Sequence, residues 1–209
     1  MLHSIGIWAL ALSAASFVVI ALDLLFHRQK MMVMNFVWPV TALYFGPFAL
    51  WSYFRFGRGG RQQPFWQAVW IGDTHCGAGC TLGDIIAESA VFLTGFTLLG
   101  SKLLASYLWD FLLAYLLGIV FQYFAIAPMR NISGWPAIWA AIKADTISLI
   151  TFEIGLFAFM FWMSKHFHPS LEANQPEYWF LMQIGMIIGF FTSYPANWWL
   201  IRSGLKEAM

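Results

Sequence analysis

Long apolar stretches with few polar interruptions dominate the chain. Six windows reach roughly the 20 mostly apolar residues that a helix needs to cross a bilayer. They lie at residues 5–26, 33–54, 81–100, 108–127, 139–163 and 178–201. These runs are continuous and lack the alternation of a β-barrel, and within lipid a helix satisfies every backbone group of such a run. The pattern therefore predicts an all-α integral membrane bundle of six transmembrane helices.

Composition supports this class. Of the 209 residues, 60% are hydrophobic and 10% are charged, and the mean hydropathy is +0.68. A soluble domain carries about 25% charged residues, so most of this surface must face lipid. The net charge of +1 argues against nucleic acid as a partner. With no linker-like segment, residues 1–209 are expected to form one transmembrane domain in the lipid bilayer.

The first and second windows carry further signals. No Lys or Arg precedes the first apolar run, so we expect a retained helix and not a cleaved signal peptide, although residues 12–16 resemble a cleavage site. Pro39 and Pro47 in the second window and Pro195 in the sixth are expected to kink their helices, because proline removes a backbone donor.

Lys and Arg placement predicts the orientation, because cytoplasmic loops carry an excess of these residues. With six crossings, seven fall on one side and four on the other, which favours two cytoplasmic termini in the cytoplasmic (inner) membrane. Residues 55–64 then form a basic cytoplasmic loop that sets topology or binds anionic lipid headgroups. The seven are Arg55, Arg58, Arg61, Arg130, Lys143, Arg202 and Lys206; the four are Arg28, Lys30, Lys102 and Lys165.

The segment from residue 73 to residue 84 holds the only two cysteines, Cys76 and Cys80, with His75 directly before the first. Thiolate and imidazole are ligands suited to Cu(I) or Zn. Gly77 and Gly79 permit unusual backbone angles that would turn both sulfurs toward one point. We expect an interfacial segment over residues 65–84, with the motif at the cytoplasmic mouth of the third helix.

Other interpretations of this motif remain open. A tetrahedral metal ion needs four ligands, and His75, Cys76 and Cys80 supply only three. Asp84, Met129 or a second copy of the protein would supply the fourth. The cysteines would alternatively form a redox dithiol, or simply be small buried residues beside a helix start. Thr81 and Asp84 also fit a capping box, which would explain Asp84 without any ligand.

Further titratable residues lie within the predicted helices. Glu88 follows Asp84 by one helical turn, and the fifth window contains Lys143, Asp145 and Glu153. Charges within a membrane are costly and usually face the bundle interior, so each is a candidate for a polar pathway that relays protons or ions. Lys143 would instead reach the cytoplasmic surface, and a structural pair of Asp145 with Arg130 or Lys143 is equally compatible with the sequence.

Several motifs together resemble an uncharacterised prokaryotic family of multi-pass membrane proteins, a domain of unknown function. The resemblance spans residue 31 to the C-terminus and implies no established activity, although such proteins are associated with copper-handling contexts. The matching segments are residues 34–39, the motif from His75 to Asp84 continuing to Glu88, and residues 121–124, 128–130, 143–146 and 194–199.

Together these features predict a membrane protein that binds a soft metal ion through His75, Cys76, Cys80 and Asp84, for transport, sensing or homeostasis. Two alternatives are a membrane thiol-disulfide oxidoreductase and a non-catalytic subunit of a larger membrane complex or homo-oligomer.

Overall fold

The chain folds entirely into helices in a computed structural model that describes residues 1–58, 63–167 and 171–207. Within these ranges no strand forms beyond one isolated bridge between Leu98 and Ser101. The all-α prediction is therefore confirmed for this part of the chain. The elements are α1 (Leu2–Phe26), α2 (Met34–Phe45), α3 (Pro47–Ser52), the π-helix η1 (Tyr53–Gly57), α4 (Phe65–Thr94), α5 (Lys102–Arg130), α6 (Trp135–His166) and α7 (Pro176–Arg202).

Five helices, α1 and α4 to α7, are long and apolar enough to cross a membrane. Large apolar side chains such as Leu22, Leu116 and Ile154 are exposed on their outer faces. A soluble protein would not present so many, whereas lipid accepts them. The predicted membrane protein is thus supported, but six spans are not confirmed.

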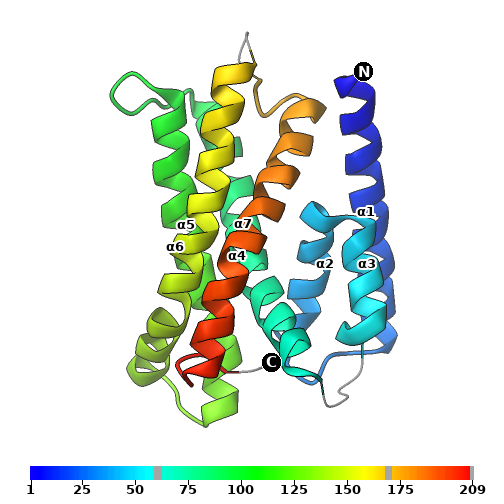
Figure 1. Cartoon of the computed structure of the whole chain (residues 1–209), viewed down its shortest axis with the longest axis vertical. Coiled ribbons are helices and arrows are strands. Elements are labelled where there is room, and N and C mark those ends of the chain that lie inside the picture. The colour runs from blue at the N-terminus through cyan, green and yellow to red at the C-terminus, as the bar shows by residue number, and fades with distance from the viewer. Residues whose placement is uncertain (59–62, 168–170, 208–209) are drawn as a thin grey trace.

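The second predicted window is interrupted at its centre. Gly46 adopts φ 55° and ψ −131°, a backbone conformation suited to glycine, and Pro47 begins the next helix. Figure 1 shows α2 rising from the lower end of the bundle and α3 returning toward it. At about 1.5 Å per residue, the 12 residues of α2 span only about 18 Å. The window therefore forms a helical hairpin that enters and leaves at one end.

This α2–α3 hairpin is tied to α1 near that end. The Tyr53 hydroxyl donates to Asp23 Oδ2 at 2.7 Å, and Arg58 lies 3.1 Å from Asp23 Oδ1. Arg58 belongs to the predicted basic loop, of which residues 59–62 lie outside the described residues. Pro39 and Pro195 lie inside α2 and α7, and the kinks expected at these prolines stay predictions.

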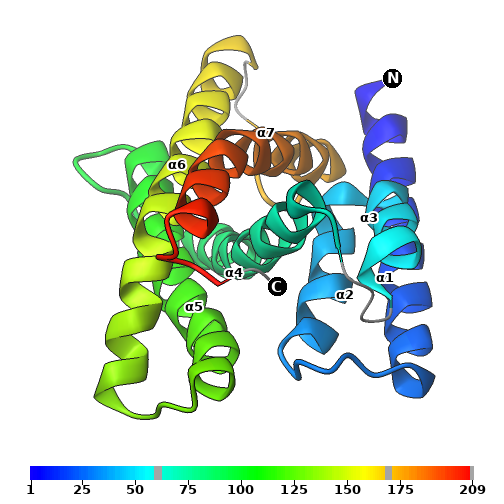
Figure 2. The same cartoon turned by 60° about the horizontal axis from the view of Figure 1, so that its bottom comes forward.

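Helix α4 occupies the centre of the molecule. It packs against α2, α5, α6 and α7, and Figure 2 shows it enclosed between these helices. Its most apolar stretch is 61% buried, against 22% for α1. The central position accounts for its sequence, because a helix shielded from lipid can carry polar groups that an outer helix cannot.

Candidate functional site

The cysteine motif lies in the middle of α4 and not at its beginning. Helix α4 starts at Phe65 and continues without a break to Thr94, so the expected interfacial segment over residues 65–84 is helical. Thr81 and Asp84 are more than four turns inside the helix, which rules out the capping-box interpretation. The small and polar residues of this stretch lower its hydropathy, which is why the apolar window appeared to begin sixteen residues late.

The glycines of the motif serve helix packing. Gly79 and Gly83 face α5, where a Cβ at residue 79 would lie 3.1 Å from Gly118 Cα and one at residue 83 would lie 2.6 Å from Ala114 Cα. Neither Gly77 nor Gly79 has a positive φ, so the expectation that these two glycines adopt unusual backbone angles was wrong. A Gly-x-x-x-Gly pair allows two membrane helices to approach closely, and this pair brings α4 against α5.

The neighbouring face of α4 carries a continuous line of buried polar side chains. Residues three or four apart share a helix face, so the line extends along the helix axis. From residue 73 to residue 88 the helix rises by fifteen steps of about 1.5 Å, or about 22 Å, which is most of the roughly 30 Å hydrocarbon thickness. We call it the α4 column; it consists of Asp73, Cys76, Cys80, Asp84 and Glu88.

The two thiols lie side by side in the middle of the column. Both cysteines are free and buried, and Cys80 lies next to Cys76 and to Glu153 of α6. Cys76 Sγ is 3.3 Å from the Ser148 hydroxyl of α6. The sulfurs thus converge between α4 and α6, in a position without access for a large thiol substrate.

His75 points to a different neighbour. Its ring lies 6.0 Å from that of Phe121 on α5 and beside Gln122, while the thiols face α6. Met129 is exposed at the end of α5, remote from the motif. Among the described residues, no three or more His, Cys, Asp or Glu side chains form a group that could hold a metal ion. The predicted set of His75, Cys76, Cys80 and Asp84 therefore does not converge; its two thiols do.

A cluster of carboxyl groups continues the column beyond the thiols. Asp84 and Glu88 of α4 lie near Glu153 of α6 and Asp110 of α5, and all four are buried. Both carboxyl oxygens of Asp84, Asp110 and Glu153 have no hydrogen-bond partner among the described residues. Helix α5 begins at Lys102, so Asp110 lies about two turns inside it.

Asp145 and Lys143, the two other candidates for a polar pathway in the fifth window, lie in different environments. Asp145 is buried beside Cys76, and a Cβ at Gly118 would collide with its carboxyl group. Lys143 is exposed on α6, with its ammonium 5.2 Å from the centre of the Trp139 ring. Asp145 therefore joins the interior, whereas Lys143 faces outward and does not pair with it.

The α2–α3 hairpin adds a hydroxyl group that sequence reasoning missed. Tyr44 lies two residues before Gly46 at the hairpin tip and is buried near Asp73, Cys76 and Cys80. A Cβ at Gly77 would lie 2.7 Å from the Tyr44 hydroxyl oxygen. Gly77 thus leaves room for this hydroxyl, which has no hydrogen-bond partner among the described residues.

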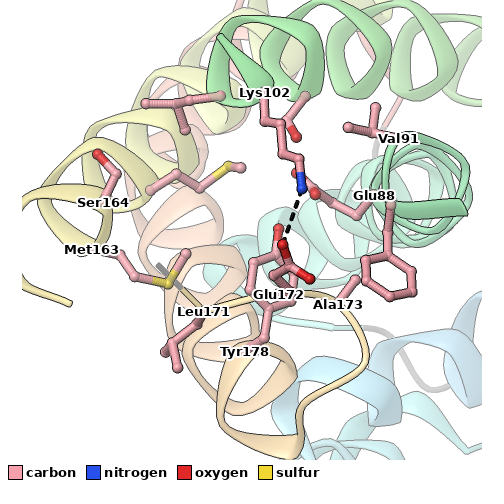
Figure 3. Close-up of a pocket in the computed structure, with 13 residues that line it drawn as sticks. Glu88, Val91, Lys102, Met163, Ser164, Leu171, Glu172, Ala173 and Tyr178 are labelled. Carbon is pink, nitrogen blue, oxygen red and sulfur yellow. Dashed lines mark hydrogen bonds and ion pairs between the residues drawn. The ribbon is translucent and has the colours of Figure 1, made fainter. Parts of the chain in front are cut away.

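A pocket of about 130 Å³ opens near the Glu88 end of the column. Figure 3 shows Glu88 and Tyr178 lining it, with the ion pair between Lys102 and Glu172, 3.0 Å long, across the pocket. Met160 and Met163 form part of its wall. Of the four carboxyl residues of the cluster, Glu88 alone lines the pocket, which lies at the end of the bundle where α4 ends and α5 begins.

The opposite end of the column is a hydrogen-bonded network. Asp73 Oδ1 accepts from the Ser193 hydroxyl at 2.7 Å and from the Asn197 amide at 2.5 Å, both on α7. Lys206, buried just after α7, donates to Asn197 Oδ1 at 2.7 Å. Sequence reasoning had not singled out Ser193 or Asn197 and had assigned Lys206 to the surface, because no local signal shows that the chain folds back after α7.

Comparison with known proteins places this architecture in a family. No curated protein and no solved structure matched the chain. A family model described as a domain of unknown function (DUF4396) matches residues 65–206, well over half of the chain. The match begins at α4 and includes the whole column, whereas the segment at residues 34–39 lies outside it. The chain belongs to this family.

Proposed function

We propose that the protein carries a cation across the membrane along the α4 column. The observation that supports this most directly is the continuity of the polar groups: adjacent thiols at the centre, then a carboxyl cluster, then a pocket near the bundle end. Buried ionisable groups within a membrane are expensive and commonly mark ion pathways. A purely structural role would not require the carboxyl groups of Asp84, Asp110 and Glu153, whose oxygens have no hydrogen-bond partner within the described part of the chain.

The thiols favour a soft monovalent metal ion, Cu(I), as the cargo. Thiolate selects Cu(I) over harder cations, and Cys76 and Cys80 offer two sulfurs side by side. Binding would replace two S–H bonds by two metal–sulfur bonds and release two protons, because the ligands must be deprotonated. Zn would need further ligands to reach four. Glu153 lies beside Cys80 to receive a proton.

The arrangement of positive charges supports an orientation different from the one expected with six crossings. Five crossings place the N-terminus and the end of α7 at opposite ends of the bundle (Figure 1). We propose that the end where α7 finishes faces the cytoplasm, by the positive-inside rule. Among the described residues, the opposite end carries Lys102 and Lys165, whereas this end carries Arg28, Lys30, Arg55, Arg58, Arg130, Lys143, Arg202 and Lys206.

Metal content tests the proposal. The purified protein, loaded with Cu(I) under reducing conditions and desalted, is expected to retain about one copper per chain, and the Cys76→Ser and Cys80→Ser variants to lose it. Met129→Leu is the matched control, because Met129 is exposed and remote from the thiols. Reconstituted liposomes then measure copper uptake. Equal copper in the wild type and both cysteine variants would remove the proposal.

The other expectations have less support. The burial of both thiols favours a small ion over a protein thiol as their partner, which weighs against the thiol-disulfide oxidoreductase. Assembly into a homo-oligomer or a larger complex stays a prediction, and co-purification of a second membrane protein would test it.

A further inference from the structure

Lys206 is buried although it belongs to the short segment after α7. The segment reverses at Gly204, where φ is 73°, and the backbone amides of Leu205 and Lys206 both donate to Leu200 O. This turn sends the lysine side chain back into the bundle, where its exposed fraction is 1%. Removing an ammonium group from water is costly, so its position calls for acceptors that repay the loss of hydration.

The ammonium group of Lys206 is not bound as in an ordinary ion pair. Lys206 Nζ donates to the amide oxygen of Asn197, which in turn donates to Asp73 Oδ1. No salt bridge involving Lys206 occurs within the described residues, and Asp73 Oδ2 has no hydrogen-bond partner there. A structural counter-charge would be expected to contact the carboxylate directly. Here the ammonium group reaches the carboxyl group only through Asn197, at the Asp73 end of the α4 column.

We propose that Asp73, Ser193 and Asn197 form a second cation-binding site at this end of the α4 column, and that Lys206, bonded to Asn197, closes it as a tethered cation held beside it. The site offers carboxylate, hydroxyl and amide oxygens, which suit a small cation in transit. Lys206 must withdraw before cargo moves through. Its segment lies beyond the end of α7 and is held by backbone bonds to Leu200 and Ile201 and by the 2.7 Å ion pair between Glu207 and Arg130, so withdrawal breaks these contacts without unwinding α7. The inference rests on the proposed cation pathway and adds the group that closes one end.

Cys76 and Cys80 are built-in reporters for this closure, because the protein has no other thiols. Sealed vesicles of both orientations are treated with 2-aminoethyl methanethiosulfonate, a small cationic thiol reagent, with a thiol scavenger on the far side. The modification rate of a buried group follows the population of the open state. For Lys206→Ala we expect the rate to rise at least about tenfold, from the side that contains the C-terminus.

The matched control is Lys165→Ala, an exposed lysine at the other end of the bundle. It should leave the rate unchanged from either side. A folded Lys206→Ala protein with wild-type labelling would overturn the inference. An increase from both sides equally would also overturn it, because this would indicate general loosening.

If Lys206→Ala does not fold, Asp73→Asn/Lys206→Met removes both charges and keeps the lysine's aliphatic stem. If the folded double variant is labelled at its thiols no faster than the wild type, or if the double variant also fails to fold, Lys206 is a structural group and the inference is refuted. The labelling requires neither metal nor transport. Increased labelling together with unchanged copper content in the cysteine variants would therefore refute the proposed function and leave the closure by Lys206 standing.

Discussion

Replacing Gly83 by alanine should separate α4 from α5 and destabilise the protein. The new Cβ would lie 2.6 Å from Ala114 Cα and 2.8 Å from the Leu113 carbonyl carbon. Carbon atoms in ordinary contact are about 3.5–4.0 Å apart, so the helices must move apart by about 1 Å. Both obstacles are backbone atoms of α5, which cannot rotate away as a side chain can. Overpacking of this kind costs about 1–3 kcal/mol, and we expect the upper part of that range.

For a chain of 150–250 residues, each kcal/mol shifts the melting temperature by about 2–4 °C, so 2–3 kcal/mol corresponds to about 4–12 °C. The melt is followed in detergent with a thiol-reactive fluorophore, because Cys76 and Cys80 are buried until the protein unfolds. Gly72→Ala is the matched control on the same helix, since its Cβ meets the end of the flexible Ile201 side chain at 3.3 Å. Equal melting temperatures for the two variants would refute the packing argument.

Three further substitutions test the column and the hairpin. Glu153→Gln should lower copper uptake at least about tenfold, equivalent to about 1.4 kcal/mol of lost cation stabilisation. The melting temperature should not fall, because both carboxyl oxygens of Glu153 lack hydrogen-bond partners among the described residues. Unchanged copper uptake in liposomes would exclude Glu153 from the pathway. Tyr44→Phe should likewise melt no lower than the wild type, since its hydroxyl has no hydrogen-bond partner in the described chain, and a clear loss of stability would contradict this. Tyr53→Phe should cost about 1 kcal/mol by removing the 2.7 Å bond to Asp23, and a melting curve identical to that of the wild type would show that this bond does not hold the hairpin to α1.

The helical membrane class could be predicted because it depends on composition and on long apolar runs, which are local properties. The hairpin was missed although a local signal was present. Gly46-Pro47 in the middle of an apolar window is a turn signal, but a hydropathy average over the whole window conceals it. A window long enough to span a bilayer does so only if its backbone continues as one helix.

The site could be predicted only in part. Cys76, Cys80, Glu88, Asp145 and Glu153 were all identified as unusual for a membrane helix, and all are buried inside the bundle. Which of them meet depends on how α4, α5 and α6 are rotated against one another, and this follows from the glycine contacts. The contributions of Tyr44 and Lys206 depend on tertiary folding of segments outside the motif, and hydropathy gives no indication of them.

The charge balance of the column restricts how any cation can pass. Four carboxyl groups, Asp84, Glu88, Asp110 and Glu153, lie together, and no lysine, arginine or histidine forms a salt bridge with any of them in the described chain. An unpaired ionised carboxylate in a dry interior is far too costly for all four to be charged at once. A positive ion entering the cluster is therefore accommodated best when a proton leaves, which keeps the net charge constant. The same balance applies at the thiols, where metal binding releases protons. Under the proposed function, cargo and protons would therefore move in exchange, and Lys206 is the buried positive charge bonded to Asn197 at the Asp73 end of the column.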